Sequence, residues 1–288
     1  MTSPGPILEP SVSVVVPFYN EESHLGACLR SLLKQDFRPM EIIGVDDGSQ
    51  DSSAEVCAGL GVRVIKGSHN GMAAARNAGA MATSGNILVM LDADMTFDPE
   101  YVSRLVAPII SGNAVATSHW NERVANWDNP WARCQTWYFG LPDGRRHPAG
   151  KPPGSGQYRA VRKDFFLDNG GLSEAEGYTA DISLFRKTGV YADIIDDAVC
   201  YHRNVEGPAE LFKEAVWRGR SLAFKKEGRV ARILAAAFLH RNPLIDALRT
   251  VRQAFSRREP RLPLYALLFS SGQLFGAVSA LVSGNYQK

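Results

Sequence analysis

Apolar and polar positions alternate along the first 117 residues in a way that predicts strands and helices in turn. Short runs of aliphatic and β-branched residues predict buried strands, and apolar residues at every third or fourth position predict helices. The expected strands are 12–17, 41–45, 62–66, 86–91 and 114–117, and the expected helices are 23–35, 52–60, 71–83 and 99–110. Strands that alternate with helices predict an α/β fold, a Rossmann-like and mostly parallel sheet with helices on both faces.

The middle of the chain is less regular. Residues 141–156 are rich in Pro and Gly and predict a long loop, a kind of segment that often carries function. We expect a strand over 157–163, a helix over 179–187 and a strand over 190–202.

The C-terminal part changes character. Helices are expected over 209–227, 230–240 and 244–255, and Leu262–Gly284 then runs for 23 residues without a formal charge. That length suffices to cross a bilayer, although Pro263 and several polar residues dilute it. Three interpretations stay open: a membrane span, an amphipathic segment lying on or half inserted in a membrane, and a buried helical hairpin.

The charge of the chain is divided between two regions. The formal net charge is only +2, which gives no case for a nucleic-acid partner. It is the sum of −7 over residues 1–207 and +9 over residues 208–288. We therefore expect a catalytic domain over 1–207 and a basic, helical, membrane-associating appendage over 208–288. Basic residues just before the uncharged run, Arg257, Arg258 and Arg261, fit a flank that faces an anionic membrane surface.

Cysteine usage indicates a reducing compartment. The four cysteines lie far apart and form no C-x-x-C pair, which argues against a zinc ribbon or a disulfide framework. The first residues lack the basic and apolar regions of a signal peptide. We expect a cytoplasmic protein, peripheral on or anchored to the cytoplasmic face of a membrane.

Polar clusters follow three of the expected strands, at 18–21, 46–49 and 92–94. In open α/β sheets ligands bind at the carboxyl ends of strands. The last cluster reads Asp92-Ala93-Asp94, and its two carboxylates form a hard-oxygen site that suits Mg²⁺ or Mn²⁺ holding a diphosphate. A cap for the helix that begins near Pro99 is the structural alternative.

A phosphatase of the haloacid-dehalogenase type is a second interpretation of the same residues. The run LVMLDADMT fits the pattern in which the first Asp is a phosphorylated nucleophile. That motif normally opens its fold on the first strand, whereas three strand–helix units precede it here.

The combination of motifs resembles the family 2 glycosyltransferases of the GT-A fold. The segments VSVVVPFYNE at 12–21, IGVDDGSQD at 43–51, NGMAAARNAG at 70–79 and LDADMTFDP at 91–99 occur in this order. The resemblance covers residues 11–205 well and the tail only in general style. It implies a metal-dependent, inverting transfer of a sugar from a nucleoside-diphosphate donor of the UDP or GDP type to an acceptor hydroxyl.

The resemblance also implies roles for residues of the donor site. Pro17, Tyr19 and Glu21 are expected to line the nucleotide pocket, and Asp46 or Asp47 to bind the edge of the base. Asp47 has an alternative role as a turn or helix cap. Arg76 is expected to contact the base or the phosphates. Asp92, Ala93 and Asp94 are expected to bind the ribose, the metal and the diphosphate, with Asp92 and Asp94 as metal ligands.

Further residues are implied downstream. Asp181 matches the catalytic base of the family, which would take the proton of the acceptor hydroxyl. The preceding residue is Ala180 where the family has Glu, so Asp181 is the single candidate. His202 matches a histidine that some relatives use as a metal ligand. Arg218 and Arg220 resemble a Trp/Arg motif that lies near the diphosphate, with a basic helix face as the alternative.

The composition of the C-terminal region predicts the class of acceptor. A cationic, apolar C-terminal region predicts that the acceptor is a polyprenyl-linked or cell-surface glycan close to a membrane. A polyprenyl-phosphate sugar synthase is the alternative enzyme.

Overall fold

The computed structural model describes residues 5–224 and 242–283, so the helix expected over 230–240 lies outside the described residues. Contacts divide the chain into two compact units. The first, here called the sheet unit, comprises Met1–Arg123, Gly150–Glu174 and Ala180–His202. The second, the helical unit, comprises Val124–Ala149, Ala175–Thr179 and Arg203–Lys288. The domain boundary predicted at residue 207 stays a prediction.

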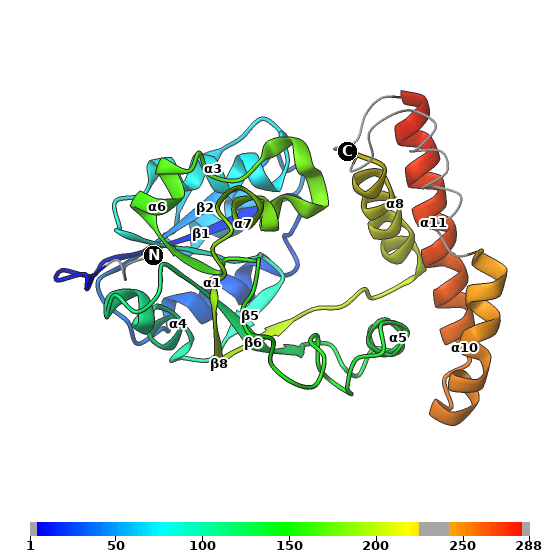
Figure 1. Cartoon of the computed structure of the whole chain (residues 1–288). Helices are drawn as coiled ribbons and strands as arrows, with labels where there is room; N and C mark the ends of the chain where they lie inside the picture. Colours follow the sequence, from blue (N-terminus) through cyan, green and yellow to red (C-terminus); the bar gives the residue numbers. More distant parts are fainter. Residues whose placement is uncertain (1–4, 225–241, 284–288) are drawn as a thin grey trace. The chain divides into compact units, whose positions relative to one another are not determined.

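The sheet unit is built on one eight-stranded sheet in the order β3-β2-β1-β4-β7-β6-β8-β5 (Figure 1). Its strands are β1 Val12–Phe18, β2 Met40–Asp46, β3 Arg63–Lys66, β4 Ile87–Met90, β5 Met95–Phe97, β6 Ala116–Val124, β7 Ala160–Arg162 and β8 Asp193–His202. Strands β3, β2, β1 and β4 are parallel, as the alternating pattern predicts. The other half is antiparallel where β7 joins β4 and β6 and where β5 joins β8.

Helices cover both faces of the sheet because successive strand residues point to opposite sides. Their bounds are α1 Leu25–Leu33, α2 Ser53–Gly59, α3 Met72–Ala82, α4 Tyr101–Ile110, α6 Lys163–Asp168 and α7 Ser183–Thr188. Val14 and Val16 of β1 belong to one buried cluster with α1 and α4, whereas Val15 packs with Ala75 of α3. On α3, Gly79 approaches the sheet so closely that a Cβ there would lie 2.4 Å from Val15. The α/β prediction is confirmed.

Some short elements have no clear pattern in the sequence. Strand β5 has only three residues and owes its existence to pairing with β8. The helix expected over 179–187 is a 3-10 segment, Glu174–Ile182, kinked at Gly177 and followed by α7. The strand expected over 157–163 shortens to β7. All four cysteines are free and buried, in agreement with the absence of a disulfide framework.

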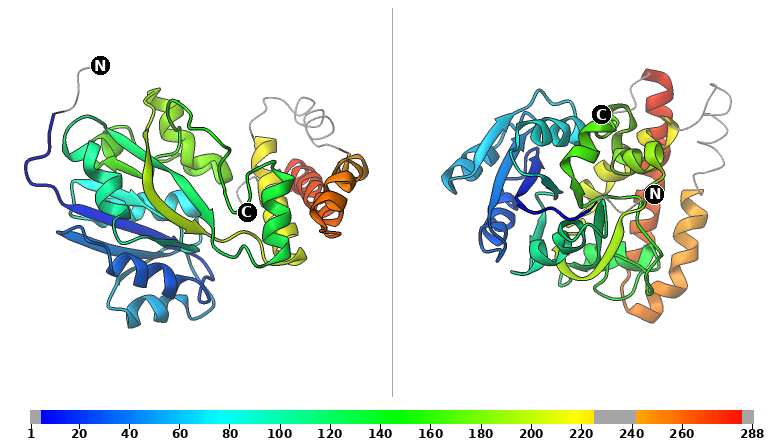
Figure 2. Two further views of the ribbon diagram at one scale, coloured as in Figure 1. Left: turned by 90° about the horizontal axis from the view of Figure 1, so that it is seen from below. Right: turned by 60° about the vertical axis from the view of Figure 1, so that its left-hand side comes forward.

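The helical unit contains α5 Pro130–Tyr138, α8 Pro208–Phe224, α10 Pro243–Arg257 and α11 Leu262–Ser283. Helix α5 was not expected; it begins where the Asn129 side chain accepts a hydrogen bond from Trp131 N and where Pro130 takes the first helical position. Helix α11 lies beside α8 and α10 (Figures 1 and 2).

Glycines allow α11 to approach α8 at backbone distance. A Cβ added at Gly276 would lie 2.0 Å from Val216 O, and one at Gly219 would lie 2.1 Å from Gln273 O. By length and composition alone α11 is able to cross a membrane, and 44% of its apolar window is buried inside the unit. Less than half of the window is buried, so the three interpretations of the uncharged segment stay predictions.

Candidate functional site

The strand register brings the predicted donor residues to one edge of the sheet. In the parallel pair β1–β2, Pro17 is opposite Val45 and Phe18 is opposite Asp46. Asp92 follows β4, on the other side of β1. The three polar clusters therefore lie at the carboxyl ends of adjacent strands, where ligands of open α/β sheets bind.

The two neighbouring aspartates of the second cluster differ in their use. Both are buried. Asp47 accepts hydrogen bonds from Asn70 N at 2.9 Å and Gly71 N at 2.8 Å, so both of its oxygens hold the turn that precedes α3. Asp46 accepts one from Ser49 N at 2.7 Å through Oδ1, and its Oδ2 accepts none from the described residues. The geometry thus favours the turn-and-cap role for Asp47 and leaves Asp46 available for a ligand.

An aromatic pair stands beside these carboxylates. The rings of Tyr19 and His69 lie 4.2 Å apart between centroids, with an interplanar angle of 31°. His69 Nδ1 lies 3.1 Å from the carbonyl oxygen of Asp47. Glu21 is half-buried nearby, and its backbone N–H donates to Ser53 Oγ at 2.8 Å. The pair forms a flat surface of the kind on which a planar base stacks.

Asp92 is the centre of a buried network of charges. Arg76 Nη2 pairs with its Oδ1, and Arg159 Nη1 lies 3.0 Å from its Oδ2. Burial alone would raise the pKa of Asp92, but Arg159 and Arg76 outweigh burial and hold that pKa well below its usual range. Arg76 is only 2% exposed, so its charge lies inside the unit and not on a solvated face of α3. The Nε atoms of both arginines are buried without a hydrogen-bond partner in the described part of the chain.

Asp181 joins the same network through the second terminal nitrogen of Arg76. Arg76 Nη1 pairs with its Oδ1, and Gln157 Nε2 donates to its Oδ2 at 2.9 Å. Each carboxylate oxygen has two acceptor positions, so Oδ2 retains one for a further hydroxyl. The family's preceding glutamate is Ala180 here, and it is fully buried. Arg76 and Gln157 therefore orient the Asp181 carboxylate in this chain.

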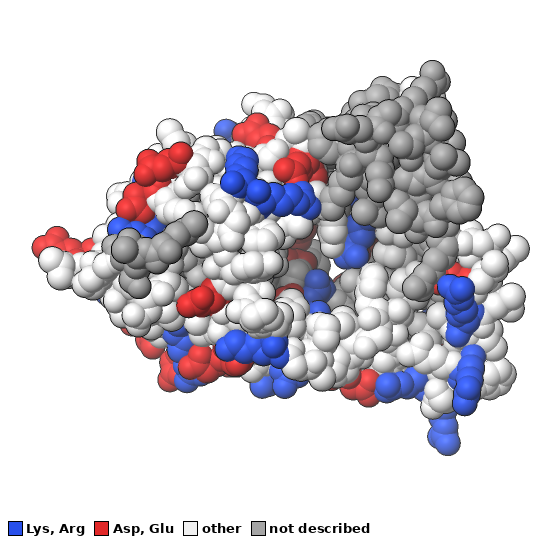
Figure 3. Space-filling view, viewed as in Figure 1, with Lys and Arg blue, Asp and Glu red and all other residues white. Residues whose placement is uncertain are grey.

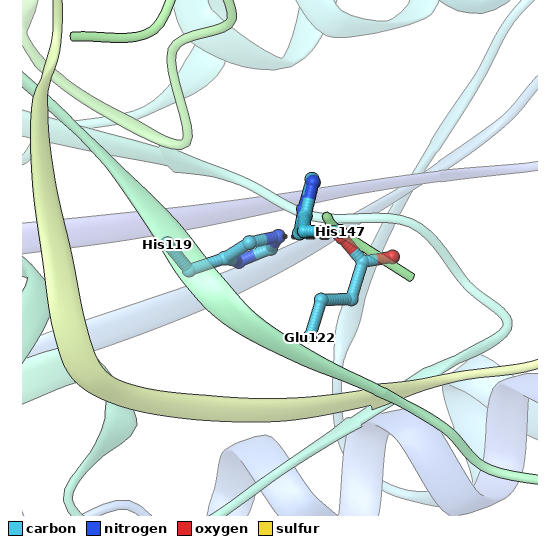
Figure 4. Close-up of side chains that lie close together, drawn as sticks. All are labelled: His119, Glu122 and His147. Atoms are coloured by element: carbon cyan, nitrogen blue, oxygen red, sulfur yellow. Dashed lines mark hydrogen bonds and ion pairs between the residues drawn. The ribbon is translucent and has the colours of Figure 1, made fainter. Parts of the chain in front are cut away.

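A second chain of contacts begins at Asp94. The pairing of Met95 on β5 with His202 on β8 places His202 Nε2 3.1 Å from Asp94 Oδ2. His202 Nδ1 contacts Glu122 Oε1. Glu122 Oε2 lies 3.1 Å from His119 Nε2, the pair drawn in Figure 4. The Tyr101 hydroxyl lies 2.7 Å from His119 Nδ1. Glu122 and His119 both lie on β6; His147, also drawn in Figure 4, belongs to the helical unit.

The contacts of His202 fit a divalent cation. A carboxylate only accepts hydrogen bonds, so the Glu122 contact places a ring proton on Nδ1 of His202. Nε2 then faces an oxygen of Asp94 at 3.1 Å, and either a proton on Nε2 or a cation held by both atoms satisfies that contact. A carboxylate oxygen together with an imidazole nitrogen suits Mn²⁺.

Arg218 and Arg220 belong to the helical unit. Arg218 pairs with Glu214 at 2.5 Å and lies over the rings of Tyr178, Phe139 and Phe269 at 4.7 to 5.7 Å. Burial alone would lower the pKa of Arg218, but Glu214 outweighs it and raises that pKa. Arg220 Nε donates to Ser279 Oγ on α11 at 3.3 Å. Both side chains thus hold the helical unit together, and their contact with a diphosphate stays a prediction.

Several residues of the network were not singled out from the sequence. Arg159 and Gln157 lie just before β7. His119 and Glu122 lie on the C-terminal part of β6, which extends seven residues beyond the strand expected at 114–117. His119 and Glu122 stand close together on one strand, but ionisable residues at such positions also occur on many surface strands and do not indicate a site.

The sequence of the chain matches the family model Glycosyl transferase family 2 over residues 13–170. The match covers more than half of the chain. The chain belongs to glycosyl transferase family 2. This membership decides against the phosphatase interpretation of Asp92-Ala93-Asp94 and confirms the resemblance that the four motifs carry.

Curated relatives of this family 2 chain are similar over its N-terminal part. Glycosyltransferase GlyA of Streptococcus pneumoniae is 34% identical over 113 residues, which are 38% of this chain and 16% of that protein. The undecaprenyl-phosphate 4-deoxy-4-formamido-L-arabinose transferase of Pseudomonas aeruginosa is 38% identical over 132 residues, 42% of this chain and 38% of that protein. The matches span well under half the length of these relatives.

Solved structures share the fold over a larger part of the chain. The mannosyltransferase PcManGT from Pyrobaculum calidifontis, in complex with GDP-Man and Mn²⁺, gives a TM-score of 0.61 at 18% identity and covers 98% of this chain and 90% of its own. Glucosyl-3-phosphoglycerate synthase from Mycobacterium tuberculosis, in complex with Mn²⁺, UDP and phosphoglyceric acid, gives 0.53 at 24% identity and covers 75% and 77%. At these identities the likeness shows the GT-A fold of this family 2 chain.

Proposed function

We propose that this protein transfers a sugar from a nucleoside-diphosphate sugar to an acceptor hydroxyl with inversion at the anomeric carbon. The observation that carries the proposal is the shared guanidinium of Arg76, which joins the predicted diphosphate-side residue Asp92 to the predicted base Asp181. One network thus contains the groups for both halves of a displacement.

The donor would bind along the carboxyl edge of the sheet. The base would stack on Tyr19 and His69 and meet the free oxygen of Asp46, with Pro17 and Glu21 completing the pocket. Asp92 would accept hydrogen bonds from the ribose. The identity of the base, uracil or guanine, is a question for the donor screen described below.

Asp94 and His202 would hold Mn²⁺ or Mg²⁺, with Glu122 fixing the His202 ring. When bound, the ion supplies a Lewis acid that neutralises the leaving diphosphate. Mn²⁺ accompanies a sugar nucleotide or UDP in both similar structures named above, which supports this proposal.

Asp181 would act as the general base. Its Oδ2 retains an acceptor position for the acceptor hydroxyl, while Arg76 and Gln157 keep the carboxylate oriented. The proton would move from that hydroxyl to Oδ2 as the oxygen attacks the anomeric carbon.

The acceptor would be carried by a lipid, either a polyprenyl-linked or cell-surface glycan or a polyprenyl phosphate itself. The undecaprenyl-phosphate transferases among the relatives and the basic, apolar helical unit support this class. The protein would then act at the cytoplasmic face of a membrane. The polyprenyl-phosphate synthase reaction is the alternative. Its nucleophile is an ionised phosphate oxygen rather than a hydroxyl, so that reaction would not need Asp181 to take a proton.

Donor binding and transfer test the proposal separately. A thermal-shift screen of UDP- and GDP-sugars with Mn²⁺ should identify a stabilising donor, because a bound ligand raises stability by mass action. Asp181→Asn should then lose transfer by a factor on the order of 10² to 10⁴ and keep the donor-induced shift, because general-base catalysis contributes that much. Asp164→Asn, an exposed aspartate on α6, is the matched control. Near-normal transfer by Asp181→Asn would refute the assignment of the base.

A further inference from the structure

Helix α10 of the helical unit buries polar side chains and exposes its large apolar ones. The residues that face the interior of the unit are Asp246, Thr250 and Ala254, all buried. The apolar residues point outward: Leu244 is 66%, Leu248 71% and Phe255 82% exposed. An ordinary surface helix of a globular protein shows the opposite arrangement.

The orientation of α10 is held by specific contacts on its polar side. Ser270 Oγ of α11 donates to Asp246 Oδ2 at 2.6 Å, and the Tyr138 hydroxyl of α5 donates to the same oxygen. The Asn242 side chain caps the N-terminus by accepting from Leu244 N at 3.0 Å. Rolling the apolar side inward would break these buried hydrogen bonds, so they hold the apolar stripe outward.

The outward stripe is continuous along the helix. Leu244, Leu248, Val251 and Phe255 follow one another at intervals of four, three and four residues, which places them on one face of the helix. A stripe of this kind on a helix with a strong separation of apolar and polar faces is typical of helices that lie in a membrane interface.

Arginines accompany the stripe. Arg249 and Arg252 are exposed along its side, and Arg258 is exposed at the C-terminal end. None of the three makes an ion pair within the ranges that the structure describes. The acidic residues closest in sequence, Asp246 and Glu259, are buried and already paired. Lys and Arg side chains accordingly dominate the charged surface where α10 lies in the view of Figure 1 (Figure 3).

We propose that α10 docks on an anionic lipid surface, lying in its plane with the apolar stripe among the acyl chains and the arginines at the lipid phosphates. The apolar stripe matches the acyl region, and the unpaired arginines match anionic headgroups. A second copy of the chain fits less well, because a symmetric contact would bring the same arginines together. The inference rests on the proposed function in one respect: an enzyme whose acceptor is carried by a lipid needs such a surface.

Vesicle binding of the full chain tests the docking. We expect co-sedimentation with vesicles that contain phosphatidylglycerol and little with vesicles of phosphatidylcholine alone. Arg249→Gln with Arg252→Gln should weaken the binding about fivefold for each arginine, because one cation near such a surface contributes about 1 kcal/mol. Leu248→Gln with Phe255→Gln should weaken it by roughly tenfold or more, because the stripe supplies the inserted apolar area.

Matched controls are available in the sheet unit. Met81→Gln on α3 replaces an apolar side chain that is 71% exposed, and Lys34→Gln removes an exposed cation after α1. Both should bind vesicles like the unaltered chain. Equal binding by the α10 variants and the controls would overturn the proposal, and so would self-association that the α10 variants abolish in the absence of vesicles.

Donor binding separates this inference from the function that it deepens. Stabilisation by a nucleotide sugar with Mn²⁺ should be unchanged in every α10 variant. A chain that binds its donor but no anionic vesicle would refute the docking of α10 and leave the proposed function standing. A chain that binds vesicles through α10 but no sugar nucleotide refutes the proposed function and leaves the lipid surface as the partner of α10.

Discussion

Replacing Glu122 by Gln tests whether the buried carboxylate determines the orientation of His202. In the unaltered chain the two oxygens of Glu122 accept from His202 Nδ1 and from His119 Nε2. Glutamine has the same shape but only one acceptor oxygen, so its amide N–H₂ must face one of the two imidazoles. The residue is only 5% exposed, so water cannot replace the lost hydrogen bond.

The expected effect is a weaker metal site with an intact fold. Losing an outer hydrogen bond to a metal-binding histidine typically weakens metal affinity by about 10- to 100-fold, which corresponds to about 1.4 to 2.7 kcal/mol. A hydrogen bond to a charged group has a similar free energy, about 1.5 to 3 kcal/mol. The measurement is direct titration with Mn²⁺ followed by electron paramagnetic resonance of the free ion, which needs no substrate.

Two further variants make the outcome decisive. Glu100→Gln makes the same chemical change at an exposed side chain before α4 and should bind Mn²⁺ normally. His202→Ala should lose more affinity than Glu122→Gln. Loss with His202→Ala but unchanged affinity with Glu122→Gln would refute the orienting role, and unchanged affinity in both would refute the placement of the metal.

Two other predictions concern stability. Glu41 accepts hydrogen bonds from Ser13 Oγ and from the backbone N–H and hydroxyl of Ser84, just after α3. Burial alone would raise the pKa of Glu41, but these hydrogen bonds outweigh burial and lower that pKa. Since the pKa of Glu41 is lower in the folded state, its stabilisation is full above the unfolded value of about 4.3 and is lost as the pH falls. The free energy of unfolding of Glu41→Gln, measured with urea, should therefore fall less on acidification than that of the unaltered chain. An equal fall in both proteins would contradict the stabilisation by Glu41. Gly276→Ala should lower the melting temperature by several degrees, corresponding to roughly 2 kcal/mol, because its Cβ would meet the backbone of α8. Gly59→Ala, which has open space around the added Cβ, is the control and should keep the melting temperature of the unaltered chain. Equal melting temperatures of the two variants would refute the close contact of α11 with α8.

The strands and helices that the sequence predicts well are those with a complete local pattern. Val12–Phe18 and Tyr101–Ile110 have buried runs or periodic apolar faces long enough to specify their type. Strand β5 has three residues and depends on a partner about 100 positions away, so no local window contains its cause. The orientation of α10 is a further example: its periodicity predicts a helix, but the apolar face is the exposed one, since the buried contacts of Asp246 decide which side packs.

The candidate site divides in the same way. Polar clusters at strand ends predicted Asp46, Asp92 and Asp94, because the carboxyl edge of a parallel sheet is fixed by the order of elements. Asp181, in the 3-10 segment Glu174–Ile182, was predicted by the family resemblance instead. Their partners were not predictable from spacing. Arg159, Glu122 and Gln157 reach the site from the antiparallel half of the sheet, where the pairing of β7, β6 and β8 sets the geometry.

The position of Arg76 has a consequence for how the proposed reaction is controlled. One guanidinium pairs with both Asp92 and Asp181, so a change at the donor side alters the charge that the base experiences. Every residue of this coupling belongs to the sheet unit, whereas the proposed lipid-docking helix belongs to the helical unit. The contacts that orient the base therefore lie within the sheet unit, and changes on α10 should affect delivery of a lipid-borne acceptor while leaving this orientation intact.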